Sequence, residues 1–195
     1  MDGEGKHAPH LIEEVYNLED ALVIAGFLNS FVRHADSIKI ANIAQIVNVI
    51  APILTRGDDM LIQSIFYPFE MFATRGTGIA LRTAVDGPTY TGKTYGEVTT
   101  IDTSAILDGD TLQVFATNRS LTESAEFEIV LVERSIAGFS SGQVLTGPDP
   151  KAANSYKQPN LVTAGPLEGV QIKDGVATVT LPPLSVAAMT LSLGA

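Results

Sequence analysis

The first strong hydrophobic periodicity lies between residues 17 and 33. Apolar side chains recur there every three or four residues, which is the spacing of one helical face. They are Leu18, Leu22, Ala25, Leu28 and Val32, and the stripe is widened by Ala21, Ile24, Phe27 and Phe31. Asn17 is a good N-cap, and Asp20 can complement the free amides of the first turn. The pattern predicts a helix over 18–32 that is buried on more than one side.

A short apolar segment follows this helix. Ile38–Ala41 is brief and rich in β-branched residues, so we expect a buried strand there. Asn42 and Gln45 come directly after it. Amide side chains placed just past the carboxyl end of a strand are what an α/β barrel uses to hold a polar ligand. The segment therefore predicts a candidate binding site at Asn42 and Gln45.

A second amphipathic helix is predicted from about residue 61 to residue 72. Its apolar positions are Leu61, Ile62, Ile65, Phe66, Phe69 and Phe72. Pro68 lies inside this stretch, and we expect it to kink the helix because it removes a backbone donor. Gly76 and Gly78 then end the helical part of the chain.

From residue 79 onward, short alternating runs are separated by Gly, Thr, Ser and Asp, a texture typical of an antiparallel sandwich. Asp108-Gly109-Asp110 and Asp174-Gly175 are predicted hairpin turns, and 148–166 is predicted to be a long loop. The expected fold is thus mixed, with a helical α/β arm at 1–78 and an all-β sandwich at 79–195. The expected strands are Ile79–Val85, Thr99–Leu107, Thr111–Asn118, Ala125–Val132, Gly142–Leu145, Val170–Lys173, Val176–Leu181 and Ser185–Leu193.

The charge and the cysteine count of the chain exclude several classes of function. The 195 residues carry 22 acidic and 12 basic side chains, for a formal net charge of -10. We therefore expect no nucleic-acid partner and no anionic membrane partner. The chain has no cysteine, which excludes disulfides, thiolate metal sites and thiol catalysis. Residues 1–10 lack the apolar segment of a signal peptide, so a cytoplasmic location is expected.

The motifs of the arm resemble a known enzyme family. The runs YNLEDAL, FLNSFVRHAD and KIANIAQIVNVIAP, followed by QSIFYPF and VLTGPDPKAANS, are similar to glycoside hydrolase family 51, the α-L-arabinofuranosidases. The similarity extends from about Ala8 to Leu193. It implies that 1–78 is the C-terminal end of a catalytic (β/α)8 barrel and that 79–195 is the C-terminal β-sandwich.

The resemblance also indicates what this chain lacks. Retaining glycosidases use two carboxyl groups about 5–5.5 Å apart, and in the family both are glutamates. One lies in an Asn-Glu dipeptide and the other in a segment similar to Asp-Glu-Trp-Asn. The chain contains neither an Asn-Glu dipeptide nor any tryptophan. No catalytic residue is therefore expected within it, and whether the chain by itself is an enzyme stays uncertain.

One functional position does carry over from the family. A glutamine just after the eighth barrel strand binds a hydroxyl of the arabinofuranose, and Gln45 matches it. Asn42 is a weaker candidate, because an amide at that point also caps backbone groups. The resemblance implies no metal and no organic cofactor.

These observations predict the C-terminal portion of an α-L-arabinofuranosidase that releases terminal arabinofuranose from arabinan or arabinoxylan. We expect it to associate with the missing barrel portion or as a homo-oligomer, because the helix at 18–32 is too apolar to face water. Two alternatives remain open. The chain is a non-catalytic carbohydrate-binding or structural sandwich with a helical arm, or it is one subunit of an enzyme whose catalytic glutamates lie on a separate chain.

Overall fold

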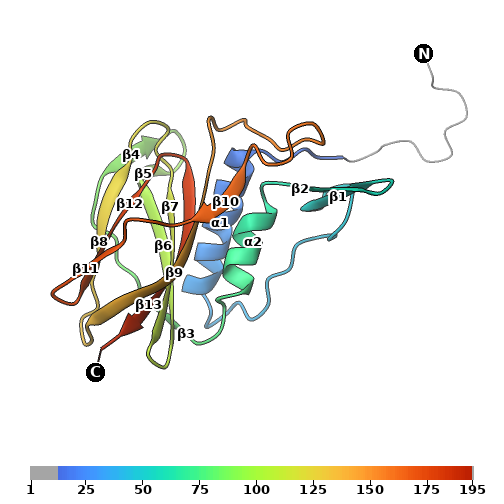
Figure 1. Ribbon diagram of the computed structural model, residues 1–195. Coiled ribbons are helices and arrows are strands. Elements are labelled where there is room, and N and C mark those ends of the chain that lie inside the picture. The colour runs from blue at the N-terminus through green and yellow to red at the C-terminus, as the bar shows by residue number, and fades with distance from the viewer. Residues whose placement is uncertain (1–12, 195) are drawn as a thin grey trace, which may run out of the picture.

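The computed structural model describes residues 13–194 and arranges them in three layers (Figure 1). The middle layer is a six-stranded antiparallel sheet. Two helices, α1 (Leu18–Arg33) and α2 (Phe66–Ala73), cover one face of it. A three-stranded sheet covers the other face, in the order β11 (Gln171–Lys173), β12 (Val176–Leu181), β8 (Ala125–Ile129). The strands of the six-stranded sheet are, in spatial order, β10 (Thr163–Pro166), β9 (Ile136–Thr146), β13 (Ser185–Leu193), β7 (Thr111–Asn118), β6 (Ile101–Asp108) and β3 (Ile79–Leu81).

Two hairpins stand outside these layers. The first joins β1 (Ile53–Arg56) to β2 (Asp59–Ile62) and precedes α2. The second joins β4 (Thr89–Gly92) to β5 (Gly96–Thr99) and precedes β6. Neither hairpin was expected from the sequence, because their strands are short and mostly exposed and so lack a clear alternation.

Strict alternation along the central strands produces two hydrophobic cores. On β7, Phe115 faces the helices and stacks on Phe72 of α2 with ring centroids 3.9 Å apart. Its neighbours Val114 and Ala116 face the three-stranded sheet. On β13, Ala188 faces the helices and Met189 faces the three-stranded sheet. Because successive side chains of a strand point to opposite faces, each central strand contributes to both cores.

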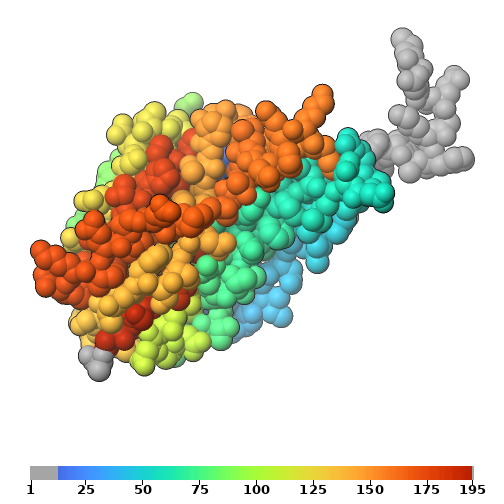
Figure 2. Space-filling view, in the orientation of Figure 1, coloured from blue at the N-terminus to red at the C-terminus, as the bar shows by residue number. Residues whose placement is uncertain are grey.

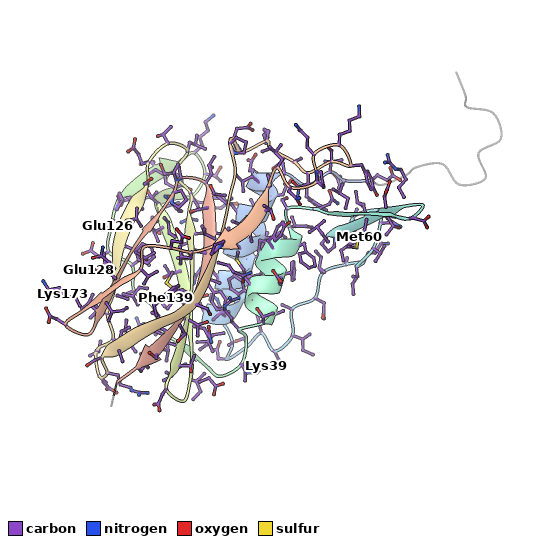
Figure 3. The ribbon with its side chains drawn as sticks, in the orientation of Figure 1. Lys39, Met60, Glu126, Glu128, Phe139 and Lys173 are labelled. Atoms are coloured by element: carbon purple, nitrogen blue, oxygen red, sulfur yellow. The ribbon has the colours of Figure 1, made fainter. Side chains whose placement is uncertain are left out.

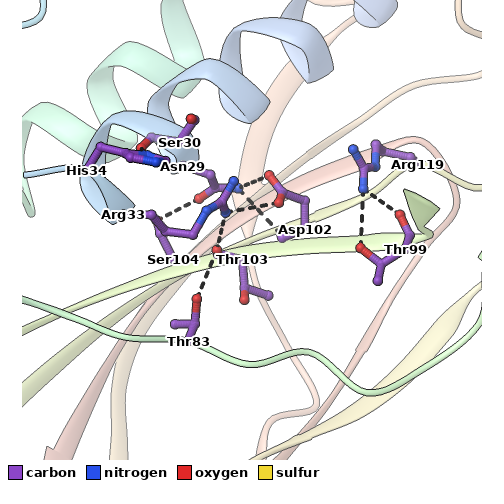
Figure 4. A network of polar contacts seen from close by, with 10 residues as sticks. All are labelled: Asn29, Ser30, Arg33, His34, Thr83, Thr99, Asp102, Thr103, Ser104 and Arg119. Carbon is purple, nitrogen blue, oxygen red and sulfur yellow. Dashed lines mark hydrogen bonds and ion pairs between the residues drawn. The ribbon is translucent and has the colours of Figure 1, made fainter. Parts of the chain in front are cut away.

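The first helix forms as its sequence predicts and is joined to β6 by buried polar contacts (Figure 4). Asn29 and Arg33 lie one turn apart on α1. The hydroxyl of Ser104 donates to Oδ1 of Asn29 at 2.7 Å, and Nδ2 of Asn29 donates to Asp102 Oδ2 at 3.1 Å. The guanidinium of Arg33 donates to Asp102 Oδ1 at 3.0 Å. Asn29 and Ser104 are fully buried, so these contacts fix the helix on the sheet.

The second helix is shorter than predicted. It begins at Phe66, while Leu61 and Ile62 belong to β2. Pro68 consequently lies in the first turn, where backbone amides have no intrahelical partner, so it removes no helical hydrogen bond and causes no kink. Gly57 lies in the turn of the β1–β2 hairpin, with φ 60°.

The strand predicted at Ile38–Ala41 is absent, and that prediction is wrong for this chain. The segment has no regular secondary structure, and Ile40 is 77% exposed. A parallel strand needs neighbours to pair its backbone groups and is normally buried on both faces. All strand pairs in the described residues are antiparallel and lie elsewhere, so nothing there can complete a sheet around this segment.

Most of the predicted sandwich is confirmed. The strands at Thr111–Asn118, Val176–Leu181 and Ser185–Leu193 have the predicted bounds. The turns at Gly109 and at Asp174–Gly175 have positive φ, as tight hairpins require. The strand expected at 142–145 is much longer, and the loop expected at 148–166 ends in β10. The first strand of the sandwich is shorter than expected and ends at Leu81.

The helical arm is not a separate appendage. Leu18 and Ala25 of α1 share one core with Leu145 and Val186 of the sheet, so the inner face of the arm packs on the sandwich. In the space-filling view the teal segment, which contains the β1–β2 hairpin and α2, lies directly against the orange segment near residues 150–166 (Figure 2). On the outer face of α1, Val23 and Phe27 are 52% and 55% exposed in the described chain, so the partner expected to cover this apolar helix stays a prediction.

The junction between the arm and the sandwich gives a test of this packing. Gly78 has φ +129°, and a Cβ there would lie 2.4 Å from the carbonyl oxygen of Leu107. We expect Gly78→Ala to lower the free energy of unfolding by at least ~2 kcal/mol, since both the backbone conformation and the contact oppose it. Gly87→Ala is the matched control, because Gly87 has open space around its Cβ position. Urea unfolding followed by circular dichroism measures both, and equal midpoints would contradict the packing described.

Candidate functional site

The predicted site residues lie on the connection between α1 and the β1–β2 hairpin. The helix ends at His34, whose ring Nδ1 lies 2.8 Å from the carbonyl oxygen of Ser30. The amides of Ser37 and Ile38 bond the carbonyl of His34 at 2.9 and 2.8 Å and turn the chain away from the helix. After this turn the chain passes through Asn42 and Gln45 before it reaches β1.

Asn42 and Gln45 are both exposed. Within the described residues, no hydrogen bond is formed by the side-chain amide of either one, nor by the backbone of 39–45. The structure does not bring the two amides into a shared hydrogen-bond network. Both amides keep their full capacity to donate and accept, as a group that binds a sugar hydroxyl requires.

The turn just beyond Gln45 is, in contrast, firmly held. The amide of Asn48 donates to the carbonyl of Ile53 at 2.8 Å, and its side chain bonds the amide and the hydroxyl of Thr55. Val47 forms a parallel bridge with Ile53. These contacts fix the turn on strand β1.

A buried glutamine holds the same turn from the other side. Gln63 is 1% exposed and uses both atoms of its amide. Its Nε2 donates to the carbonyl of Ala51 at 2.7 Å and to that of Glu14 at 3.3 Å, while its Oε1 accepts from the amide of Tyr16 at 3.0 Å. The sequence did not single out Gln63 or Asn48, because a polar residue in a loop carries no periodic signal.

Tyr16 adds a third contact to this turn. Its hydroxyl donates to the carbonyl of Ile50 at 3.0 Å. Burial raises the pKa of the Tyr16 hydroxyl, and the negative charges of Glu14 and Asp20 raise it further. A raised pKa means that the neutral, donating form is favoured in the folded state, so this contribution is complete below pH ~10 and is lost as the pH rises through the folded pKa.

A cleft of about 350 Å³ lies near the site, but its lining suits apolar contacts and not the binding of sugar hydroxyls. It is lined mainly by apolar residues of α1 and α2 and by 38–41, and it includes neither Asn42 nor Gln45. Its charged lining residue is Lys39, whose Nζ donates to the carbonyl of Ala35 at 2.6 Å (Figure 3). No group of three metal-binding side chains occurs in the described residues, and no helix among them is long and apolar enough to span a membrane.

The opposite side of the molecule carries charged side chains. Glu126, Glu128 and Lys173 lie at that side, on the three-stranded sheet (Figure 3). Glu126 and Glu128 are exposed and pair with Thr180 and Thr178 across the strands. The single ring of β8, β11 and β12, that of Phe127, packs against the core instead.

Comparison with known proteins agrees with the motifs of the arm. The sequence profile of the family described as "Alpha-L-arabinofuranosidase C-terminal domain" matches residues 2–185. An intracellular exo-α-(1→5)-L-arabinofuranosidase of Streptomyces lividans is 37% identical over 180 residues, which are 91% of this chain and 27% of the relative. An exo-α-(1→6)-L-arabinofuranosidase of Bifidobacterium longum is 36% identical over 91% of this chain and 35% of its own length.

Solved structures extend this similarity to three dimensions. A family 51 α-L-arabinofuranosidase of Bifidobacterium longum superposes with a TM-score of 0.86 at 32% identity, covering 94% of this chain and 36% of the other. The family 51 arabinofuranosidase of Xanthomonas axonopodis pv. citri gives 0.84 at 28% identity, covering 93% of this chain and 37% of the other. The chain thus spans about a third of the length of these proteins.

The buried amide of Gln63 provides a test of how the turn is held. We expect Gln63→Leu to lower the free energy of unfolding by about 1–3 kcal/mol, because the buried carbonyl of Ala51 would lose its donor and the amide of Tyr16 its acceptor. Gln171→Leu is the control, since Gln171 is exposed on strand β11. Unfolding by urea compares the two variants, and a Gln63 variant as stable as the control would show that the amide does not hold the turn.

Proposed function

Because the chain belongs to the α-L-arabinofuranosidases of glycoside hydrolase family 51, whose C-terminal domain it contains, we propose that it is the C-terminal part of a retaining enzyme that releases terminal arabinofuranose. The observation that carries this proposal is the similarity over nine-tenths of the chain, at 37% identity to an exo-acting arabinofuranosidase. The (1→5) specificity named for the first relative makes arabinan fragments the first substrates to test. Arabinoxylan fragments, which the resemblance to the family implies, are the second.

Residues 1–78 are, in this proposal, the end of a (β/α)8 catalytic barrel, and 79–195 are the sandwich that follows it. The order helix, short apolar segment, hairpin, helix is compatible with this division. Ile38 and Ile40 of the segment at 38–41 are β-branched, residues 39–41 are exposed, and the backbone of 39–41 forms no hydrogen bond with the described chain, as expected of a parallel strand without its neighbours. The exposed outer face of α1, at Val23 and Phe27, is also suited to an apolar partner layer.

Gln45 is the proposed contact to the sugar, and Asn42 a weaker second candidate. Support comes from the match to the family glutamine and from the free amide of Gln45 among the described residues. A primary amide can donate to one sugar hydroxyl and accept from another. The two carboxyl groups of the retaining reaction, about 5–5.5 Å apart, would come from the preceding part of the enzyme.

Location and assembly follow from the same proposal. The Streptomyces lividans relative is named intracellular, which supports a cytoplasmic enzyme. The apolar outer face of α1 supports docking of the barrel portion onto this chain. Homo-oligomer formation stays a prediction.

The first test concerns the chain by itself. We expect the purified 195-residue chain to hydrolyse no aryl α-L-arabinofuranoside, because the carboxyl pair of the reaction lies outside it. Release of the aryl group can be followed by absorbance. Turnover by a clean preparation that disappears on substitution of a glutamate within residues 13–168 would contradict the proposal.

The second test concerns Gln45 in the complete enzyme that includes residues 1–195. We expect Gln45→Ala to raise the free-energy barrier for kcat/KM by about 1–3 kcal/mol, the range for loss of a partner from a buried hydrogen bond. The thermal midpoint should stay unchanged, since this exposed side chain forms no hydrogen bond with the described residues. Full activity with a lowered midpoint would instead identify Gln45 as a structural cap.

A further inference from the structure

Left-handed backbone conformations cluster beside the proposed sugar contact. Gln45, Asn48 and Val49 have φ values of 60°, 63° and 63°. A positive φ is uncommon for residues other than glycine, and for a β-branched residue such as Val49 it is an outlier. Such conformations persist only where the surroundings determine them, and they gather at functional sites. The cluster therefore raises the question of what holds this turn and for what purpose.

Asn48 holds the turn through both its backbone and its side chain. Its backbone amide donates to the carbonyl of Ile53 at 2.8 Å, and its carbonyl accepts from the amide of Ala51 at 3.1 Å. Its side-chain Nδ2 donates to the hydroxyl of Thr55 at 2.9 Å, and its Oδ1 accepts from the amide of Thr55 at 2.7 Å. Asparagine also tolerates the left-handed region better than most residues, so it suits this position on two grounds.

The contacts on the two sides of Gln45 are unequal. On the C-terminal side, the carbonyls of Val49, Ile50 and Ala51 each accept a hydrogen bond, from Glu14, Tyr16 and Gln63 at 3.1, 3.0 and 2.7 Å. On the N-terminal side, residues 39–45 form no backbone hydrogen bond with the described chain. The position of Gln45 is therefore set from the C-terminal side, and Asn48 is the first residue there whose side chain is anchored.

We propose that Asn48 is a positioning residue for Gln45. By fixing the left-handed turn on strand β1, the Asn48 side chain holds the Gln45 amide where it bonds a hydroxyl of the arabinofuranose. This inference rests on the proposed role of Gln45 and adds the residue through which the β1–β2 hairpin acts on the site. A displacement of about 1 Å at such a contact is enough to lower the rate about 100-fold.

A double-mutant cycle in the complete enzyme tests the proposal. Gln45→Ala, Asn48→Ala and the double variant are compared by kcat and KM on an aryl arabinofuranoside. We expect Asn48→Ala to lower kcat/KM roughly 10- to 100-fold, with the same division between kcat and KM as Gln45→Ala. The double variant should be no worse than Gln45→Ala alone, because Asn48 acts through Gln45.

Conservative variants separate positioning from loss of folding. Asn48→Asp keeps the acceptor for the Thr55 amide and should stay within roughly threefold of the parent. Thr55→Ser keeps the hydroxyl and the amide that Asn48 bonds, and it is the matched control. Thermal midpoints of all variants are measured alongside the kinetics. A fall in activity of Asn48→Ala that follows a lowered midpoint, with no return in Asn48→Asp, would overturn the proposal.

The cycle also distinguishes this inference from the function on which it rests. If Gln45→Ala lowers activity while Asn48→Ala does not, or if the two effects simply multiply, Asn48 is not a positioning residue and the role of Gln45 stands. If Gln45→Ala has the kinetics of the parent, the sugar contact itself is misassigned and the inference falls with it.

Discussion

Burial of the six-stranded sheet on both faces is the constraint on which the structure depends. Each central strand packs against the helices on one face and against the three-stranded sheet on the other. Phe115 and Met189 therefore face opposite cores although they lie on neighbouring strands. A sheet covered on one face alone would expose a broad apolar surface to water, at a cost of roughly 25 cal/mol per Å². The helices of the arm are thus required by the sandwich.

Polar side chains decide how the helices sit on that sheet. Apolar packing is not directional, whereas the buried bonds of Asn29 with Ser104 and Asp102 allow a single register between α1 and β6 (Figure 4). At the turn after Gln45, too, directional hydrogen bonds set the position of the backbone while apolar contacts bury it. There the amide of Gln63 bonds three backbone groups that the apolar core could not place.

The candidate site joins a firmly held turn to an unpaired segment. Residues 48–52 are anchored by several elements, and residues 39–45 have no backbone partner in the described chain. This contrast fits a segment whose remaining contacts belong to a catalytic barrel, as proposed for this family. In that proposal, the sandwich supports the helices and the hairpin that lie on either side of the Gln45 segment.

The sequence by itself determined the elements whose stability is local. The cap at Asn17, the period of α1, the glycine turns and the alternating strands of the sandwich were all readable from residue order, and the motif around Gln45 identified the family. Only the tertiary structure decided the rest. The strand expected at Ile38–Ala41 needs parallel neighbours that the described chain does not supply, and α2 starts late because Leu61 and Ile62 pair with β1. The roles of Asn48 and Gln63 depend on hydrogen bonds to residues up to 49 positions away, and no periodicity in the sequence records such distant contacts.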